Sequence, residues 1–228
     1  MNNLRLVYFK MRALAEAPQL MLHYTGTPYS YEMAWEYFGQ PWSEVKTSVA
    51  YRQLPMLVVD NDTRICQSGA ITRFLAQLTG LQPEDPLVRG EVDALYETSQ
   101  EMFMPLNPTI NFAVGEKFES MKSELLEQIQ PRLADFERLL NAKPDMPFFF
   151  GETPFYCDFG VFHHVNLALF LDEGLLGAYP RLREFMSTLE GLAGVREYLA
   201  NRPELIGVGT QPQLVIDGVA RPTGVVNE

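Results

Sequence analysis

The chain has 228 residues, and its 46% hydrophobic and 12% aromatic content is that of a folded globular protein rather than a disordered one. The formal net charge of −11, from 18 Lys and Arg against 29 Asp and Glu, opposes binding to a nucleic-acid backbone. The first residues lack the pattern of a secretory signal, the longest apolar stretch (159–171) is too short to span a bilayer, and the 2 cysteines suggest no disulfide framework. We therefore expect a cytoplasmic protein that binds neither nucleic acid nor a membrane.

The first third of the chain has the pattern of a small α/β unit. We expect strands at residues 4–8, 29–33, 55–60 and 63–66, and helices at about 12–24 and 68–78. The last two strands form a hairpin that turns at Asn61-Asp62, and Gly80 ends the second helix. This order of elements suggests a thioredoxin-like domain over residues 1–81.

After residues 83–86, the strand signals give way to long amphipathic stretches. These stretches predict helices at 121–140, 180–189 and 194–199. Pro131 lies inside the first of them and predicts a kink there. Residues 82–228 are thus expected to form an all-helical second domain. The tail after Gly207 has no periodicity and predicts an extended cover or a partly disordered end.

Three short pieces are informative when they are taken together: Tyr8, Gln53-Leu54-Pro55 and Gln67-Ser68. A proline at the head of a strand often follows a cis bond, which turns the preceding backbone N–H and C=O outward. Ser68 is a good N-cap, and a helix N-terminus with a free hydroxyl is also an anion site. Trp42 and Lys46, four residues apart, present an indole N–H and a cation. Singly, each piece also has an ordinary structural explanation.

In this order and spacing, the pieces resemble the glutathione site of a cytosolic glutathione transferase of the tyrosine type, sigma-like and related to the alpha, mu and pi classes. The resemblance extends over most of the chain and is sharpest in the first third. It implies the glutathione transferase fold, a thioredoxin-like N-terminal domain followed by an all-helical C-terminal domain. It also implies a homodimer that uses glutathione, as co-substrate or as a returned cofactor, and no metal.

The resemblance implies that Tyr8 is the catalytic residue, whose hydroxyl stabilises the glutathione thiolate. A free thiol is only about 3% ionised at neutral pH, and lowering its pKa by about two units requires roughly 2.7 kcal/mol. One hydrogen bond to a charged acceptor supplies about 1.5–3 kcal/mol, so a single hydroxyl is enough. The glutathione-binding residues implied are Tyr8, Trp42, Lys46, Gln53, Leu54, Pro55, Gln67, Ser68 and Glu101.

Within this set, Leu54 is expected to hold the cysteinyl part of glutathione, the helix at Ser68 the γ-glutamyl carboxylate, and Trp42 and Lys46 the glycyl carboxylate. Glu101 is expected to reach across the dimer to the γ-glutamyl ammonium, although it could equally be a solvated helix carboxylate. The acceptor pocket is expected to comprise Phe9, Met11, Leu14, Met104 and Asn107.

Tyr51 stands where tyrosine-type transferases carry an aromatic key that inserts into the partner subunit, although Arg52 follows it where a glycine is usual. Leu14 stands where the family often has a second arginine, and this removes a positive charge close to the thiolate. The helix cap of the second domain is altered too, with Phe155 at the cap position ahead of Asp158, so that Thr153 or Pro154 could start that helix instead.

The reaction implied is addition of the glutathione thiolate to a hydrophobic electrophile. Two alternatives stay open: a glutathione-dependent double-bond isomerase, and a non-catalytic carrier or structural protein with the same fold. A metal site is not expected, because the adjacent residues His163 and His164 point about 100° apart on a helix.

Overall fold

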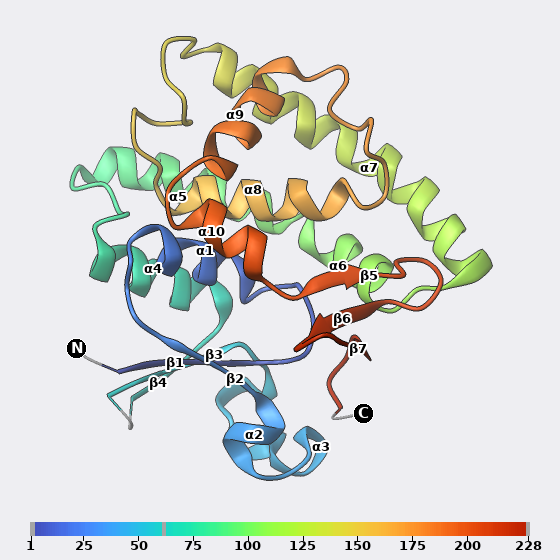
Figure 1. The fold of residues 1–228 in the computed structure, drawn as a ribbon. Coiled ribbons are helices and arrows are strands. Elements are labelled where there is room, and N and C mark those ends of the chain that lie inside the picture. Colours follow the sequence, from blue (N-terminus) through green and yellow to red (C-terminus); the bar gives the residue numbers. More distant parts are fainter. Residues whose placement is uncertain (1–2, 61–62, 227–228) are drawn as a thin grey trace.

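The computed structural model describes residues 3–60 and 63–226 (Figure 1). Its first part is a four-stranded sheet with the order β2-β1-β3-β4. The strands are β1 (Leu4–Tyr8), β2 (Ser30–Met33), β3 (Met56–Val59) and β4 (Thr63–Cys66). β1 pairs in parallel with β2 and antiparallel with β3, and β3 pairs antiparallel with β4. The four strands predicted from the sequence are confirmed, and each of their ends agrees to within one residue. The turn at 61–62 lies outside the described residues.

Helices cover both faces of this sheet. α1 (Glu16–Tyr24) and α4 (Ser68–Thr79) lie on one face, and α2 (Ala34–Phe38) lies on the other, followed by the short α3 (Trp42–Val45) (Figure 1). Sequence analysis placed the start of α1 at about residue 12, which is wrong. Pro18 has no N–H and is tolerated only in the first turn of a helix, so a start at Glu16 suits it and a start at Arg12 would bury it in the helix interior.

The second part of the chain is helical up to residue 201, as predicted. Its helices are α5 (Pro86–Gln100), α6 (Phe103–Asn111), α7 (Gly115–Asn141), α8 (Tyr156–Ala168), α9 (Pro180–Glu190) and α10 (Val195–Asn201). α7 is one helix that runs through Pro131, and the kink expected there stays a prediction. Within the described ranges, no helix is long and apolar enough to cross a membrane.

α8 is buried on all sides, and Asp158 stabilises its start. Phe155 is the N-cap residue, so neither Thr153 nor Pro154 begins the helix. Phe155 has no side-chain acceptor, and the Asp158 carboxylate accepts hydrogen bonds from the backbone N–H of Phe155 at 2.8 Å and of Phe149 at 3.2 Å. Burial raises the pKa of Asp158 to about 7, and the two backbone donors oppose that shift.

The end of the chain, residues 203–226, forms what we call the C-terminal strap. It contains β5 (Glu204–Ile206), β6 (Gln213–Ile216) and β7 (Val219–Pro222), which pair in an antiparallel three-stranded sheet. In Figure 1 the strap continues from α10 and passes α6 towards the N-terminal sheet. Sequence analysis predicted an extended or disordered tail, and these three strands are a feature that it did not predict.

Hydrogen bonds attach the strap to the rest of the molecule at several places. The guanidinium of Arg12 donates to the carbonyl of Pro203 at 2.6 Å. The hydroxyl of Thr223 donates to the carbonyl of Asn111 at 2.6 Å, and the N–H of Gly224 donates to the carbonyl of Lys10 at 3.0 Å. The last residues of the strap therefore lie against the segment that follows β1.

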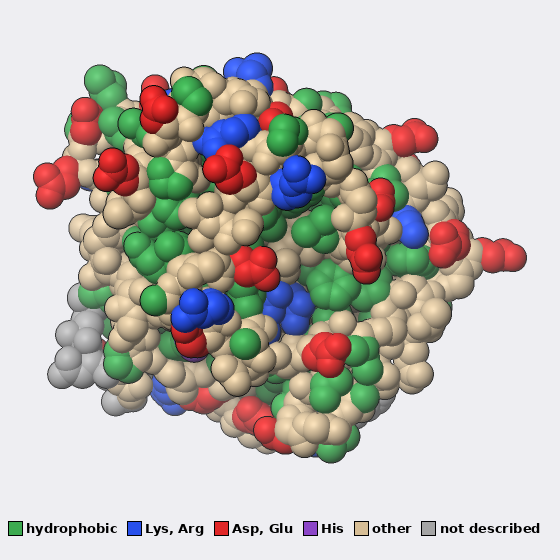
Figure 2. Space-filling view, turned by 45° about the horizontal axis from the view of Figure 1, so that its top comes forward, with side chains coloured by type: hydrophobic (Ala, Val, Ile, Leu, Met, Phe, Trp, Pro, Cys, Tyr) green, Lys and Arg blue, Asp and Glu red, His purple; other side chains and the backbone are tan. Residues whose placement is uncertain are grey.

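The surface reflects the acidic composition. Among the described side chains on the face shown in Figure 2, Lys and Arg lie singly between acidic and hydrophobic neighbours and do not join into a basic patch. A polyanion approaching this face would therefore meet charges of both signs.

Candidate functional site

Most of the predicted site residues line one pocket of about 450 Å³, between the N-terminal sheet, α6 and the end of the strap. The predicted residues that line it are Tyr8, Phe9, Met11, Leu14, Trp42, Gln53, Leu54, Pro55, Gln67, Ser68, Met104 and Asn107. They come from separate parts of the sequence, and the fold brings them together. We call this cavity the Tyr8 pocket.

Tyr8 lies at the end of β1 with 3% of its surface exposed. Burial raises the pKa of its hydroxyl well above the ordinary value, and a hydrogen bond with the backbone of Leu14 opposes this shift. The phenol therefore stays protonated at neutral pH. A neutral buried O–H in a pocket is a hydrogen-bond donor suited to an anionic sulfur.

The loop before β3 presents backbone groups to the same pocket. The Leu54–Pro55 peptide bond is cis, as sequence analysis anticipated for a proline at the head of a strand. Next to it, the side-chain amide of Gln67 donates to the side-chain carbonyl of Gln53 at 3.2 Å. Arg52 and Gln67 both line the pocket with positive φ, 54° and 74° respectively, and such backbone strain is often found at ligand sites.

The N-terminus of α4 points its unpaired groups toward this region. Gln67 is the N-cap residue and Ser68 is the first residue of the helix, so the prediction that Ser68 is the cap is wrong by one position. The carbonyl of Gln67 accepts from the N–H of Ile71 at 3.0 Å, and the N–H groups before Ile71 have no acceptor within the helix. Those donors, together with the Ser68 hydroxyl, can bind a carboxylate.

Three predicted residues lie outside the Tyr8 pocket. Lys46 is exposed just beyond Trp42 and lines an adjacent pocket. Glu101, at the end of α5, forms an ion pair with Arg132 of α7 at 2.5 Å. Tyr51 projects into solvent with 71% of its surface exposed. A single chain does not bring the last two to the pocket, so their predicted roles depend on a second subunit.

Four lining residues were not predicted: Arg52, Phe103, Phe112 and Val225. Phe103 is the immediate neighbour of Met104, so the pattern around Met104 could have included it. Val225 carries no local signal, because its position depends on the path of the strap. The apolar lining is thus larger than the sequence indicated.

Leu14 stands where the family often has a second arginine. The nearby Arg12 does not line the Tyr8 pocket. Arg12 is buried, and burial lowers the pKa of its guanidinium while the nearby Glu16 carboxylate opposes that shift. Glu16 forms a buried ion pair with Arg202 and accepts from the Tyr198 hydroxyl at 3.1 Å. This cluster connects α1 to the end of α10 and leaves Leu14 to line the pocket.

The two adjacent histidines are core residues of α8. Their ring centroids lie 4.9 Å apart, and burial lowers the pKa of His163 to about 3. Across residues 3–60 and 63–226, no three His, Cys, Asp or Glu side chains are arranged to hold a metal ion.

Both parts of the chain match a known protein family. Residues 4–77 match the family described as glutathione S-transferase, N-terminal domain, and residues 101–202 match the glutathione S-transferase, C-terminal domain. Glutathione S-transferase Mu 2 of Mus musculus is 30% identical over 199 residues, which are 84% of this chain and 88% of the relative. The second family match ends where the strap begins.

Solved structures have the same fold. The Pi-class glutathione S-transferase of Onchocerca volvulus has a TM-score of 0.75 at 27% identity, with 88% of this chain and 93% of that chain covered. The structure of NaGST-2 has a TM-score of 0.78 at 19% identity, with 90% and 98% covered.

Proposed function

Because this chain belongs to the glutathione S-transferase family, we propose that its Tyr8 pocket binds glutathione and ionises the glutathione thiol for attack on a hydrophobic electrophile. The observation that carries the proposal is the buried, protonated Tyr8 hydroxyl in the same pocket as the cis Leu54–Pro55 peptide and the N-terminus of α4. In this proposal residues 1–81 hold glutathione and residues 82–228 supply most of the acceptor wall. The family also supports a cytoplasmic location.

The pocket suggests one orientation for glutathione. The γ-glutamyl carboxylate accepts from the free N–H groups and the hydroxyl at Ser68, and the cysteinyl backbone pairs with Leu54. The glycyl carboxylate then lies toward Trp42 and Lys46, on the far side of the pocket. This orientation leaves the sulfur beside Tyr8.

The reaction follows from that arrangement. The thiol gives its proton to solvent, and the Tyr8 O–H donates to the resulting thiolate without losing its own proton. The sulfur lone pair then forms a bond to an electrophilic carbon. In a conjugated acceptor the displaced π electron pair takes up a proton from solvent at the neighbouring carbon, and in a substitution the leaving group departs with the electron pair of the broken bond. The hydrogen bond to sulfur lowers the thiol pKa, so a larger fraction of bound glutathione is reactive at neutral pH.

The acceptor side of the pocket is apolar and adaptable. Met11, Leu14, Phe103, Met104 and Phe112 face the site, and methionine side chains adjust to differently shaped ligands. Asn107 adds a polar group. We infer that the electrophile is hydrophobic and that the wall tolerates more than one shape.

We also propose a homodimer. Tyr51 is exposed, and a groove of about 480 Å³ between α5 and α7 is lined by apolar residues such as Phe136, Leu139 and Phe150. A second copy could insert its Tyr51 into this groove and cover both surfaces. Glu101 lies on the same side, at its ion pair with Arg132, from where it could reach the partner's glutathione.

The test measures glutathione binding by calorimetry and the ultraviolet absorbance of the bound thiolate, in the wild type and in Tyr8→Phe and Ser68→Ala. We expect Ser68→Ala to weaken binding and Tyr8→Phe to abolish the thiolate signal while glutathione still binds. A mass balance with an enone then separates a stable adduct from an isomerised product with glutathione returned. Absence of glutathione binding by the wild type would refute the proposal, and binding without a thiolate signal would indicate a carrier.

A further inference from the structure

One polar side chain, Asn107, lies on the acceptor wall of the Tyr8 pocket. In the second part of the chain, the described residues that line this pocket are Phe103, Met104, Asn107, Phe112 and Val225, and the other four are apolar. Asn107 is half-buried and lies four residues after Phe103 on α6, so both are on the same face of the helix. A hydrogen-bonding group in an apolar wall selects a partner atom on the ligand and fixes the ligand's orientation.

Asn111, one turn further along α6, contacts the amide of Asn107. The side-chain nitrogen of Asn111 donates to Asn107 Oδ1 at 3.1 Å. The same nitrogen lies 3.4 Å from the carbonyl oxygen of Arg12 and 3.5 Å from the backbone carbonyl oxygen of Asn107. Three acceptors around one nitrogen leave a single orientation for the Asn111 amide, because an oxygen in that place would be repelled by all three.

The orientation of Asn107 follows from that of Asn111. Because Asn107 Oδ1 accepts from Asn111, the NH₂ group of Asn107 points away from Asn111. Among the described residues none accepts a hydrogen bond from this NH₂ group, and its nitrogen is not enclosed by protein. Asn107 therefore presents a free donor to the pocket that it lines.

The amide of Asn111 has a cost that packing alone does not explain. Asn111 is 1% exposed, and its Oδ1 is buried with no hydrogen-bond donor among the described residues. An unpaired buried polar atom is destabilising, so an apolar side chain would suit this place better if Asn111 only filled space. What the amide does instead is hold Asn107.

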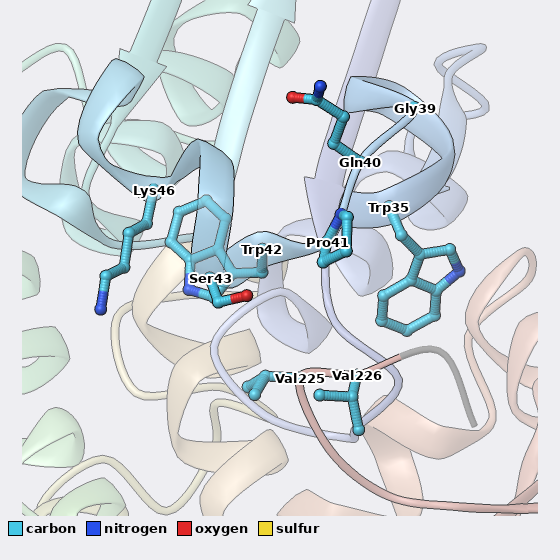
Figure 3. A pocket seen from close by; sticks show the side chains of 9 residues that line it. All are labelled: Trp35, Gly39, Gln40, Pro41, Trp42, Ser43, Lys46, Val225 and Val226. Carbon is cyan, nitrogen blue, oxygen red and sulfur yellow. The ribbon is translucent and has the colours of Figure 1, made fainter.

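The strap fixes this end of α6. Asn111 is the last residue of the helix, where carbonyl groups lack a partner within the helix, and its carbonyl accepts from the Thr223 hydroxyl at 2.6 Å. Figure 3 shows the strap just beyond this point, with Val225 and Val226 on one side of the adjacent cavity. Contacts thus run from the strap, through Thr223 and Asn111, to the donor on Asn107.

We propose that Asn107 binds the oxygen of a carbonyl conjugated to the reacting carbon, so that the electrophile is an α,β-unsaturated carbonyl compound. This inference rests on the proposed function and names its substrate class. The thiolate adds to the β-carbon, and the π electrons shift so that the oxygen carries the negative charge of an enolate. The Asn107 NH₂ group donates to that oxygen and keeps its protons. The α-carbon then takes up a proton from solvent, and the C=O bond forms again.

The donor acts more strongly on the transition state than on the bound electrophile. The carbonyl oxygen gains negative charge as the carbon–sulfur bond forms, and a hydrogen bond to a charged acceptor is stronger than one to a neutral acceptor. Asn107 therefore raises kcat more than it lowers KM. An alkyl halide develops its charge on the departing halide and gains nothing from this donor. Asn111 and Thr223 are positioning residues, since they act through Asn107.

The test compares two electrophiles on the full chain with glutathione. Benzylideneacetone is a conjugated enone, and benzyl chloride contains no oxygen and reacts by loss of chloride. Asn107→Leu keeps the approximate side-chain volume and removes the donor. We expect kcat/KM for benzylideneacetone to fall about 10- to 100-fold, mostly in kcat, and that for benzyl chloride to change less than about threefold. The ratio of the two values, the enone-to-halide ratio, cancels any change in the thiolate, which both reactions share.

A second variant tests the orientation while Asn107 stays in place. In Asn111→Asp the new carboxylate can only accept, so the Asn107 amide turns its NH₂ group toward it and its oxygen toward the pocket. We expect the enone-to-halide ratio to fall about as far as in Asn107→Leu. The thermal unfolding midpoint is the control for folding of this variant.

A matched pair of strap variants tests the positioning role without a change in α6. Thr223 and Thr210 both donate to a carbonyl, but Thr210 donates within the strap, to Gly207 at 3.0 Å. We expect Thr223→Val to lower the enone-to-halide ratio about three- to tenfold, and Thr223→Ser to restore it. Thr210→Val is expected to leave the ratio unchanged.

Three results would overturn the inference or a part of it. An enone-to-halide ratio in Asn107→Leu equal to that of the wild type would refute the role of Asn107 and leave the proposed function standing, whether both reactions slow equally or neither does. A ratio that falls in Asn107→Leu but not in Thr223→Val would keep the substrate class and remove the positioning role of the strap. A wild-type chain that does not bind glutathione would refute the proposed function and this inference with it.

Discussion

The Tyr8 pocket has two walls that differ in chemistry and in how they are held. On the N-terminal side, Tyr8, Leu54 and Pro55 are buried in the domain core and present a hydroxyl and backbone groups. On the other side, Met104, Phe112 and Val225 are exposed and present only apolar side chains. The first wall therefore consists of buried hydrogen-bonding groups, and the second of exposed apolar side chains. Under the proposed function, the N-terminal part determines the reaction, and α6 and the strap determine the choice of acceptor.

The largest expected effect concerns the contact that joins α1 to the end of α10, immediately before the strap. Glu16→Gln removes the carboxylate that pairs with Arg202 and lies near Arg12. The guanidinium groups of both arginines then lose the negative charge that offsets their own. Removing one partner of a buried ion pair costs about 3–5 kcal/mol. We expect the free energy of unfolding, measured by urea denaturation, to fall by about this amount.

A surface ion pair provides the control for this variant. Glu184 pairs with Arg181, but 63% of its side chain is exposed, so Glu184→Gln is expected to cost less than about 1 kcal/mol. Equal losses in the two variants would show that the contact between α1 and the end of α10 is no more important than a surface pair.

The next largest effect separates the chemistry of the first wall from its structure. Tyr8→Phe keeps the buried ring and removes the hydroxyl, so we expect kcat/KM to fall about 100-fold, equivalent to roughly 2.7 kcal/mol. The pKa of the bound thiol is expected to rise by about two units, as measured by its ultraviolet absorbance. Glutathione affinity and the unfolding midpoint serve as controls. An unchanged pKa of the bound thiol would show that a group other than Tyr8 stabilises the thiolate.

A smaller effect tests the position where the two walls meet. Leu14→Arg places a cation at the pocket, while the backbone of residue 14 that contacts Tyr8 is kept. We expect the pKa of the bound thiol to fall by about one unit, because an opposite charge nearby favours the thiolate. Leu14→Met is the control for side-chain size without charge. A thiol pKa that is equal in both variants would contradict the expectation.

The smallest effect belongs to the strap. Val225→Ala removes two methyl groups from a partly exposed wall, so we expect the KM for a hydrophobic electrophile to rise about two- to fivefold. The KM for glutathione is expected to stay the same. Val219→Ala, in the same strap but outside the Tyr8 pocket, provides the control. If the two variants behave alike, Val225 is not part of the acceptor wall.

The sequence alone was sufficient for the parts of the site that depend on local chemistry. A tyrosine at a strand end, a proline at the head of a strand and a serine at the start of a helix each carry their geometry with them, since backbone hydrogen bonding and proline stereochemistry are local properties. Their order along the chain indicated the family and the fold, and the comparisons confirm both.

Errors arose where a competing local rule was overlooked. The pattern of apolar residues before Glu16 suggested an earlier helix start, but Pro18 limits how far the helix extends backward. The prediction that Ser68 is the cap was wrong because Gln67 adopts a positive φ and takes the N-cap position. Both corrections concern helix ends, where a single residue decides which backbone groups are free.

The tertiary structure alone determined the strap and what it contacts. Its strands have three or four residues each, too few for alternation of side chains to stand out, and they pair only because the chain folds back on itself. The position of Val225 in the Tyr8 pocket follows from anchors at Asn111 and Lys10, more than a hundred residues away in sequence. Sequence indicated the residues that we propose to act on sulfur, because their geometry is local. Only the folded chain determined the apolar surfaces, because burial and contact are properties of distant segments brought together.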